Sequence, residues 1–198
     1  VLAGKQAVPD ELLPGQPYSL ATHGSFVQAN RTQAAAIATR VIDATRTALG
    51  RLQGARVLEL YAGAGGLALC LHKLGAKLTL IERYGAALDG AREAARAQAL
   101  PDLTTHAGDA LQVLHRLAQA GERFDAVIVN PPRSGLPPAV RAALCGLDAR
   151  VIVYVSCDPE TLARDLNHLS LLGYAARCIE PFDMMPLTDS VESIAVLL

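Results

Sequence analysis

Short apolar runs alternate with helix-type segments from Arg56 to the C-terminus, and this alternation strongly constrains the fold. The expected strands are Arg56–Leu60, Lys77–Glu82, Thr104–His106, Phe124–Val129, Val151–Val155, Tyr174–Ile179 and Val191–Leu198. The expected helices are Gly66–Leu74, Tyr84–Leu100, Ala110–Gln119, Pro138–Gly146 and Pro159–Leu172. This rhythm predicts an α/β fold with a mostly parallel sheet and helices on both faces. The last two strands have no helix between them, so we expect an antiparallel pair at one edge.

The region before this rhythm divides into two parts. Residues 1–25 carry three prolines and little periodicity, so we expect an irregular lead-in left from a missing N-terminal region. Residues 26–198 are expected to form one catalytic domain. An alanine-rich stretch predicts a helix from Asn30, a suitable N-cap, to about Leu49, and Gly50 fits its C-terminal end.

Composition excludes several classes of protein. The chain has 198 residues, of which 51% are hydrophobic, so it can bury a core and is not disordered. No apolar run reaches the roughly 18 residues of a membrane span, and no leader pattern is present, so we expect a cytoplasmic protein. We also expect a monomer, although the sequence itself does not specify the oligomeric state. The net charge of −1 is unlike that of a free-standing nucleic-acid binder.

The cysteines and histidines predict no metal site. The four cysteines form no C-x-x-C pair, and the five histidines form no HxH or HExxH pattern. We expect Cys70, Cys145 and Cys178 to be reduced, buried thiols.

Cys157 differs from the other cysteines because it directly follows a predicted buried strand, in the run Tyr154–Pro159 (Y-V-S-C-D-P). Functional groups gather at the carboxyl ends of parallel strands. Pro159 suits the first turn of a new helix, and an exposed thiol at a helix N-terminus can have a lowered pKa. We therefore interpret Cys157 as a nucleophile.

A glycine-rich turn follows the first expected strand of the sheet and predicts a nucleoside cofactor, either NAD or S-adenosylmethionine. The turn contains Gly63 and Gly65 and leads directly into a helix. About twenty residues later Glu82 ends the next strand, where a carboxylate can accept hydrogen bonds from ribose hydroxyls. Asp109 follows the third strand, where it can reach an adenine amine, cap the next helix, or do both.

Two further segments place polar groups at strand ends. Asn130-Pro131-Pro132-Arg133 follows an apolar run, and its prolines make a rigid loop that holds Asn130 toward the crevice. Arg133 can hold a phosphate or substrate oxygen, or simply cover the sheet end. Glu192 sits in an otherwise apolar stretch, so its pKa should be raised, which suits a general base; alternatively, it faces outward on an edge strand.

Together these segments resemble the catalytic domain of the S-adenosylmethionine-dependent RNA 5-methyluridine methyltransferases. The resemblance covers F-V-Q-A-N at 26–30, L-E-L-Y-A-G-A-G at 58–65, I-E-R at 81–83, N-P-P-R at 130–133, Y-V-S-C-D-P at 154–159 and P-L-T-D-S-V-E at 186–192. It implies a Rossmann-like class I methyltransferase with a seven-stranded sheet. It also implies methyl transfer from S-adenosylmethionine to C5 of a uridine in rRNA or tRNA.

The resemblance also assigns roles to individual residues. Cys157 is implied to add to uracil C6, and Glu192 to remove the C5 proton. The methyl-donor site is implied to comprise Gln28, Tyr61, Glu82 and Asn130, joined by Gly63, Gly65 and Asp109 from the turn and strand pattern. Pro132 and Arg133 are the expected substrate contacts. Two positions depart from the family pattern, with Asn130 where aspartate is usual and Ser190 where histidine is common.

Other classes fit the motifs less well. An amino-methyltransferase would favour an aromatic residue at position 133 and has no use for Cys157. A 5-methylcytosine enzyme would be expected to carry a second cysteine in the 130–133 loop, and an NAD dehydrogenase leaves that loop and the Cys157 motif unexplained. A binding module without turnover is the alternative from another class, and retention of Cys157 and Glu192 argues against it.

Overall fold

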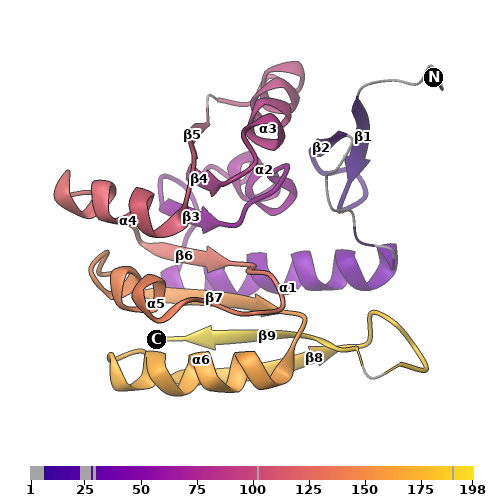
Figure 1. The fold of residues 1–198 in the computed structure, drawn as a ribbon. Coiled ribbons are helices and arrows are strands. Elements are labelled where there is room, and N and C mark those ends of the chain that lie inside the picture. Colours follow the sequence, from indigo (N-terminus) through magenta and orange to yellow (C-terminus); the bar gives the residue numbers. More distant parts are fainter. Residues whose placement is uncertain (1–6, 23–27, 29, 102, 189) are drawn as a thin grey trace.

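The computed structural model describes residues 7–22, 28, 30–101, 103–188 and 190–198. Seven of its strands form one sheet in the order β5-β4-β3-β6-β7-β9-β8 (Figure 1). These strands are β3 (Arg56–Leu60), β4 (Lys77–Glu82), β5 (Thr104–Ala107), β6 (Ala126–Val129), β7 (Val151–Ser156), β8 (Ala176–Phe182) and β9 (Glu192–Leu197). The helices are α1 (Arg31–Leu49), α2 (Gly66–Lys73), α3 (Gly85–Ala97), α4 (Ala110–Gln119), α5 (Pro138–Cys145) and α6 (Pro159–Leu171).

The pairing of the strands confirms the fold class expected from the sequence. Strands β3 to β7 pair in parallel, and β9 pairs antiparallel with both β7 and β8. The chain reverses its order of strand placement at β3, whose neighbours are β4 on one side and β6 on the other. In open α/β sheets, the crevice at such a switch point is where ligands bind.

Helices cover both faces of the sheet, which explains why its central strands are continuous apolar runs. Helices α1, α2 and α3 pack with one face and share a core cluster with Val57, while α4, α5 and α6 pack on the other face around Leu58. Every residue of β7 is buried. Each fully buried large apolar side chain contributes about 1.5–3 kcal/mol, so the central strands are a rigid base for the loops that follow them.

The N-terminal region differs from the sequence prediction. The stretch expected to be irregular contains an antiparallel hairpin of β1 (Ala7–Glu11) and β2 (Tyr18–Thr22). Pro9 suggested irregular structure, but proline is tolerated in an edge strand, and a two-stranded hairpin has only edge strands. The hairpin packs on α3 through Gln98, whose side chain accepts from the Tyr18 N–H at 2.9 Å and donates to the Tyr18 carbonyl at 2.8 Å.

The ends of α1 follow the predicted signals. The Asn30 side chain accepts a hydrogen bond from the Gln33 N–H at 3.2 Å, and Gly50 ends the helix in the left-handed conformation. In the described part of the chain, no helix is both long and apolar enough to span a bilayer.

Candidate active site

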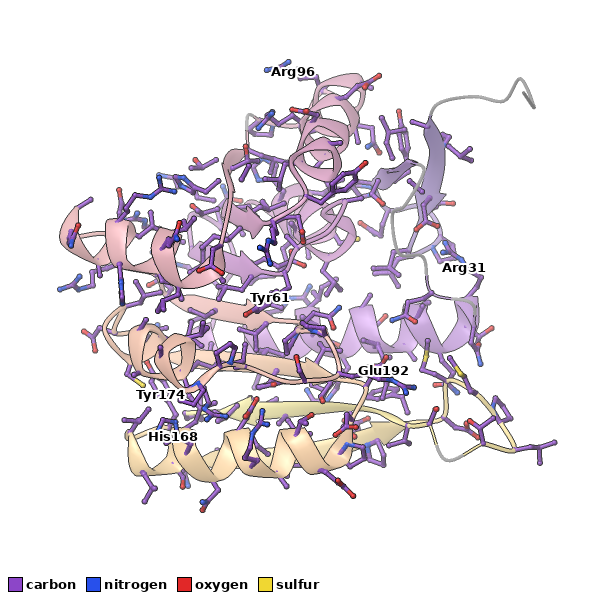
Figure 2. The ribbon with its side chains drawn as sticks, in the orientation of Figure 1. Arg31, Tyr61, Arg96, His168, Tyr174 and Glu192 are labelled. Carbon is purple, nitrogen blue, oxygen red and sulfur yellow. The ribbon has the colours of Figure 1, made fainter. Side chains whose placement is uncertain are left out.

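The residues singled out by sequence meet along one edge of the sheet. Cys157 follows β7, Asn130 follows β6, and Glu82 ends β4. Glu192 begins β9, which runs antiparallel to β7, so it reaches the same edge from the opposite direction (Figure 2). The topology therefore brings together groups that are up to 110 residues apart in the chain.

The glycine turn after β3 combines open space with tight packing. Tyr61, Gly63 and Gly65 all have positive φ, at 58°, 54° and 75°. A Cβ at Gly65 would lie 3.0 Å from the Leu80 side chain and 3.2 Å from Ala91, so Gly65 lets α2 approach the sheet. A Cβ at Gly63 would meet no atom within 4 Å, so its backbone borders open space where a ligand can approach.

Two carboxylates border this turn. Glu82 accepts hydrogen bonds from the Gly63 N–H at 3.0 Å and the Tyr84 N–H at 2.8 Å, so it ties the turn to β4. Asp109 caps α4 by accepting from the N–H groups of Leu111 and Gln112, which confirms the capping interpretation. Burial, followed by the charges of Asp109 and Glu82, raises the pKa of Tyr61, so this side chain remains a neutral phenol beside the turn.

Glu59 is a buried carboxyl group in β3 that the sequence prediction did not single out. It is 3% exposed, and its Oε2 has no hydrogen-bond partner among the described residues. Burial raises its pKa to about 8, opposed by a hydrogen bond from the Ala68 backbone N–H. A polar residue within an apolar strand was the available signal, but both faces of this strand are buried, so alternation could not reveal it.

Cys157 is half-buried, and its pKa differs from the sequence expectation. Burial raises the pKa of the thiol, and the nearby charge of Glu192 raises it further. The Arg133 charge and a hydrogen bond from its side chain act in the opposite direction. The expected lowering by a helix N-terminus is therefore wrong for the free protein, because desolvation of the thiolate outweighs the favourable interactions.

Glu192 matches the expectation of a raised pKa. It is 9% exposed, and its Oε2 has no partner in the described part of the chain. Burial raises the pKa of its carboxyl group, whereas a hydrogen bond from the Gln28 side chain and the charge of Arg133 lower it. Gln28, expected at the methyl-donor site, thus contacts the carboxylate expected to act as base.

Arg133 lies beside both reactive groups. Its side chain is exposed, forms a hydrogen bond with Cys157 and acts on Glu192 through its charge. Its Nη2 lies 3.5 Å from Ser190 Oγ. Pro132 beside it is exposed, and the Asn130 N–H donates to the Leu60 carbonyl at 3.4 Å, which joins this loop to β3.

The remaining cysteines differ from one another in burial. All four cysteines are free; Cys70 is buried as expected, whereas Cys145 and Cys178 are only half-buried. Their helix and edge-strand positions explain this difference, since each has one side facing solvent. Within the described ranges, no group of three or more His, Cys, Asp and Glu residues is placed to hold a metal ion.

The strand order and the position of the site define the fold of class I methyltransferases. A putative RNA methyltransferase from Pyrococcus horikoshii has this fold, with a TM-score of 0.62, 19% identity and coverage of 83% of each chain. The chain belongs to the tRNA (uracil-5-)-methyltransferase family, whose model matches residues 16–198. This match confirms the family resemblance that the sequence motifs indicated.

Individual relatives agree with this family. An uncharacterized RNA methyltransferase of Geobacter sulfurreducens is 43% identical over 141 residues, covering 71% of this chain and 28% of the relative. One from Listeria monocytogenes is 32% identical over 99% of this chain and 42% of its own length. The structure of the Pyrococcus abyssi tRNA (uracil-54, C5)-methyltransferase, in complex with S-adenosyl-L-homocysteine, has a TM-score of 0.82 and 31% identity. This chain covers 45% of the Pyrococcus abyssi enzyme, and it therefore spans less than half the length of each of these three relatives.

Proposed function

We propose that residues 26–198 are the catalytic domain of an S-adenosylmethionine-dependent RNA (uracil-5-)-methyltransferase. The family and the resemblance to the Pyrococcus abyssi enzyme support this activity. The observation that carries the proposal is the meeting of Cys157 and Glu192, from separate strands, with Arg133 beside both. A thiol and a carboxyl group are the two reactive groups that methylation at C5 of uracil requires.

The residues around the glycine turn fit a nucleoside methyl donor. Open space beside Gly63 allows close approach to the backbone, and α2 begins after Gly65 without a side-chain cap. Glu82 is the expected ribose acceptor and Asp109 the expected adenine contact, while Tyr61 and Asn130 border the same crevice. S-adenosylmethionine would supply the methyl group at this site.

Cys157 and Glu192 would divide the chemistry between them. The Cys157 thiolate forms a bond to C6 of uracil, which moves an electron pair from the C5–C6 double bond toward C5 and O4. Once C5 carries the methyl group, Glu192 removes the remaining C5 proton. The electron pair of that C–H bond restores the double bond, and the C6–sulfur bond breaks to release the thiolate. The uridine must leave its stack to reach this site.

The two departures from the family pattern alter contacts rather than the reactive pair. Asn130 replaces a charge with an amide, which can both donate and accept a hydrogen bond. Ser190 contacts the Arg133 guanidinium, so this position supports the cation beside Cys157. Neither change removes the thiol or the base.

We further propose that the substrate is a uridine in rRNA or tRNA and that RNA capture depends partly on segments outside this chain. The net charge of −1 provides little attraction for phosphate, and the chain spans less than half of its relatives. We expect the protein to act as a cytoplasmic monomer without a metal in this domain.

Covalent trapping tests the function directly. The whole protein containing this chain is incubated with S-adenosylmethionine and RNA that carries 5-fluorouridine. Fluorine cannot leave as a proton, so the C6 adduct should persist and map to Cys157 by mass spectrometry. Binding of S-adenosylmethionine without an adduct would contradict the proposal and favour a module that binds without turnover.

A further inference from the structure

A buried carboxylate outside the reactive pair connects the segments that carry it. Asp165 lies in α6 and is fully buried. Its Oδ2 accepts hydrogen bonds from the Leu136 N–H at 2.6 Å and the Tyr154 hydroxyl at 2.7 Å. Its Oδ1 pairs with the guanidinium groups of Arg141 and Arg164. One side chain thus links α5, α6, the strand that leads to Cys157 and the loop that contains Arg133.

Three residues on one face of α6 hold this loop at successive backbone groups. Thr161 donates its hydroxyl to the Arg133 carbonyl at 2.9 Å, and Arg164 donates to the Ser134 carbonyl at 2.8 Å. Asp165 accepts from the Leu136 N–H. These α6 positions are spaced i, i+3 and i+4, so they lie on the same side of the helix.

The loop is shaped to be held by α6. Pro131 and Pro132 have no N–H to donate, so the contacts from α6 add to the loop's own turn bond, in which the Gly135 N–H donates to the Pro132 carbonyl at 2.9 Å. Gly135 has φ +69°, and a Cβ there would lie 2.5 Å from Asp165 Oδ2 and 2.7 Å from Arg164 Nη2. The close approach of backbone and carboxylate therefore requires glycine at this position.

The energetics of this cluster favour a role in fixing geometry. Arg141 is 4% exposed, so the pair that it forms with Asp165 is buried. Buried ion pairs add little net stability, because desolvation offsets most of the Coulomb attraction. Such a pair does, however, restrict the positions available to its members. Asp165 of this pair also contacts the Leu136 N–H in the loop that carries Arg133 and the Tyr154 hydroxyl in the strand that leads to Cys157.

We propose that Asp165 is a positioning residue which, together with Thr161 and Arg164, fixes the loop 130–136 so that Arg133 lies against Cys157 and Glu192. This inference rests on the proposed function for its catalytic purpose. The position of the Arg133 guanidinium can be tested whether or not the proposed function is correct. The sequence carried a signal for Asp165, which interrupts the apolar spacing of Leu162, Leu166 and Leu169 in α6.

The pH dependence of Cys157 alkylation tests the proposal without RNA or methyl donor. The charged groups that act on this thiol are Glu192 from β9 and Arg133 from the loop. Since Arg133 favours the thiolate, its displacement should move the midpoint of alkylation to higher pH. The protein is treated with iodoacetamide across a pH series, and Cys157 is followed by peptide mass spectrometry, with Cys145 as internal reference.

Asp165→Asn is the first variant, because an amide cannot accept from all four donors around the carboxylate. Thr161→Val is the second, since it removes one hydroxyl from a half-buried site. Both should raise the midpoint by about half a pH unit, equivalent to about threefold less thiolate below the midpoint. Arg177→Ala, which replaces an exposed arginine in β8, should leave the midpoint of Cys157 alkylation unchanged.

Double variants that include Arg133→Ala distinguish loss of Arg133 positioning from a general loosening of the structure around Cys157. Arg133→Ala should raise the midpoint by itself, and adding Asp165→Asn or Thr161→Val should then produce no further shift. An unchanged midpoint in either folded single variant, or an equal extra shift without Arg133, would overturn the proposal. If Asp165→Asn does not fold, Thr161→Val decides alone. Absence of 5-fluorouridine trapping in the whole protein would remove the proposed function but not this positioning.

Discussion

At the scale of residues, the charge of Glu192 affects the ionisation of Cys157. Glu192 raises the pKa of the Cys157 thiol, and burial raises the pKa of both groups. The free site therefore disfavours two adjacent negative charges. Arg133 opposes both shifts, so the position of this one cation determines how readily the thiolate forms.

Replacement of the nucleophile should separate binding from chemistry. Cys157→Ala should abolish turnover and 5-fluorouridine trapping, while binding of S-adenosylmethionine persists, because the thiol lies outside the glycine turn. The loss of one sulfur from a half-buried site should change stability by no more than about 1 kcal/mol. Turnover assays and calorimetric binding would measure this. Cys145→Ala is the matched control, and normal activity in Cys157→Ala would rule out the covalent scheme.

Replacement of the base should stop the reaction after the adduct forms. Glu192→Gln keeps the shape of the side chain but cannot take the C5 proton, so turnover should fall by about 10²–10⁴-fold. A methylated RNA–protein adduct should accumulate and be visible on a denaturing gel. Glu160→Gln, which changes an exposed carboxylate in α6, serves as the control. Full turnover without adduct would remove Glu192 from this role.

At the scale of elements, β3 and α2 are joined by a buried carboxyl group. Glu59 in β3 accepts a hydrogen bond from the Ala68 N–H in the first turn of α2, where Gly65 provides no side-chain cap. The interaction satisfies one of the helix's free N–H groups from inside the protein. It couples the strand before the glycine turn to the helix after it.

This carboxyl group should make stability depend on pH. The folded pKa of Glu59 is about 8 and its ordinary value is 4.5, so the unfolded chain releases the proton first. Stability should therefore fall as pH rises between these two values, by at most about 1.4 kcal/mol per unit. Glu59→Gln should lack this contribution and gain stability relative to the native protein over the same range.

Thermal unfolding between about pH 5 and about pH 8 measures the difference. The exposed Glu93→Gln controls for the change in charge elsewhere on the chain. A constant difference in melting temperature between Glu59→Gln and the native protein would contradict the raised pKa.

The elements from residue 31 onward were predictable because their local signals agree with one another. Asn30 and Gly50 mark the ends of α1, and apolar runs bounded by turns mark the buried strands. Boundaries shifted where the signal was weak, so that β8 begins at Ala176 rather than at Tyr174. The hairpin of β1 and β2 was missed because its support comes from α3, far away in sequence.

At the scale of the whole molecule, sequence motifs predicted which groups reach the site but not what holds them. The topology rule alone places Cys157 and Asn130 at one edge of the sheet. The contacts of Asp165 depend on the approach of α6 to the loop 130–136, which requires the packed structure. The raised pKa of Cys157 was missed for the same reason, because burial of a loop residue is a property of its surroundings.

The hairpin offers a test of how the N-terminal region is held. Gln98→Ala removes both side-chain bonds to Tyr18, so the hairpin should open more often while the sheet stays intact. Hydrogen exchange in peptides covering residues 7–22 should rise by about fivefold to 150-fold, since each of the two lost bonds contributes about 0.5–1.5 kcal/mol. Gln119→Ala, an exposed change at the end of α4, is the control. Equal protection of the hairpin in both variants would contradict its attachment through Gln98.

The switch in strand order at β3 divides the site into two halves. Strands β3, β4 and β5 lead to the glycine turn, Glu82 and Asp109, whereas β6, β7 and β9 carry Asn130, Cys157 and Glu192. Within the sheet, the two halves are joined where β3 pairs with β6. Evolution could therefore redesign the reacting half for a different target base while inheriting the donor half unchanged. A single fold would then serve many acceptors with one methyl source.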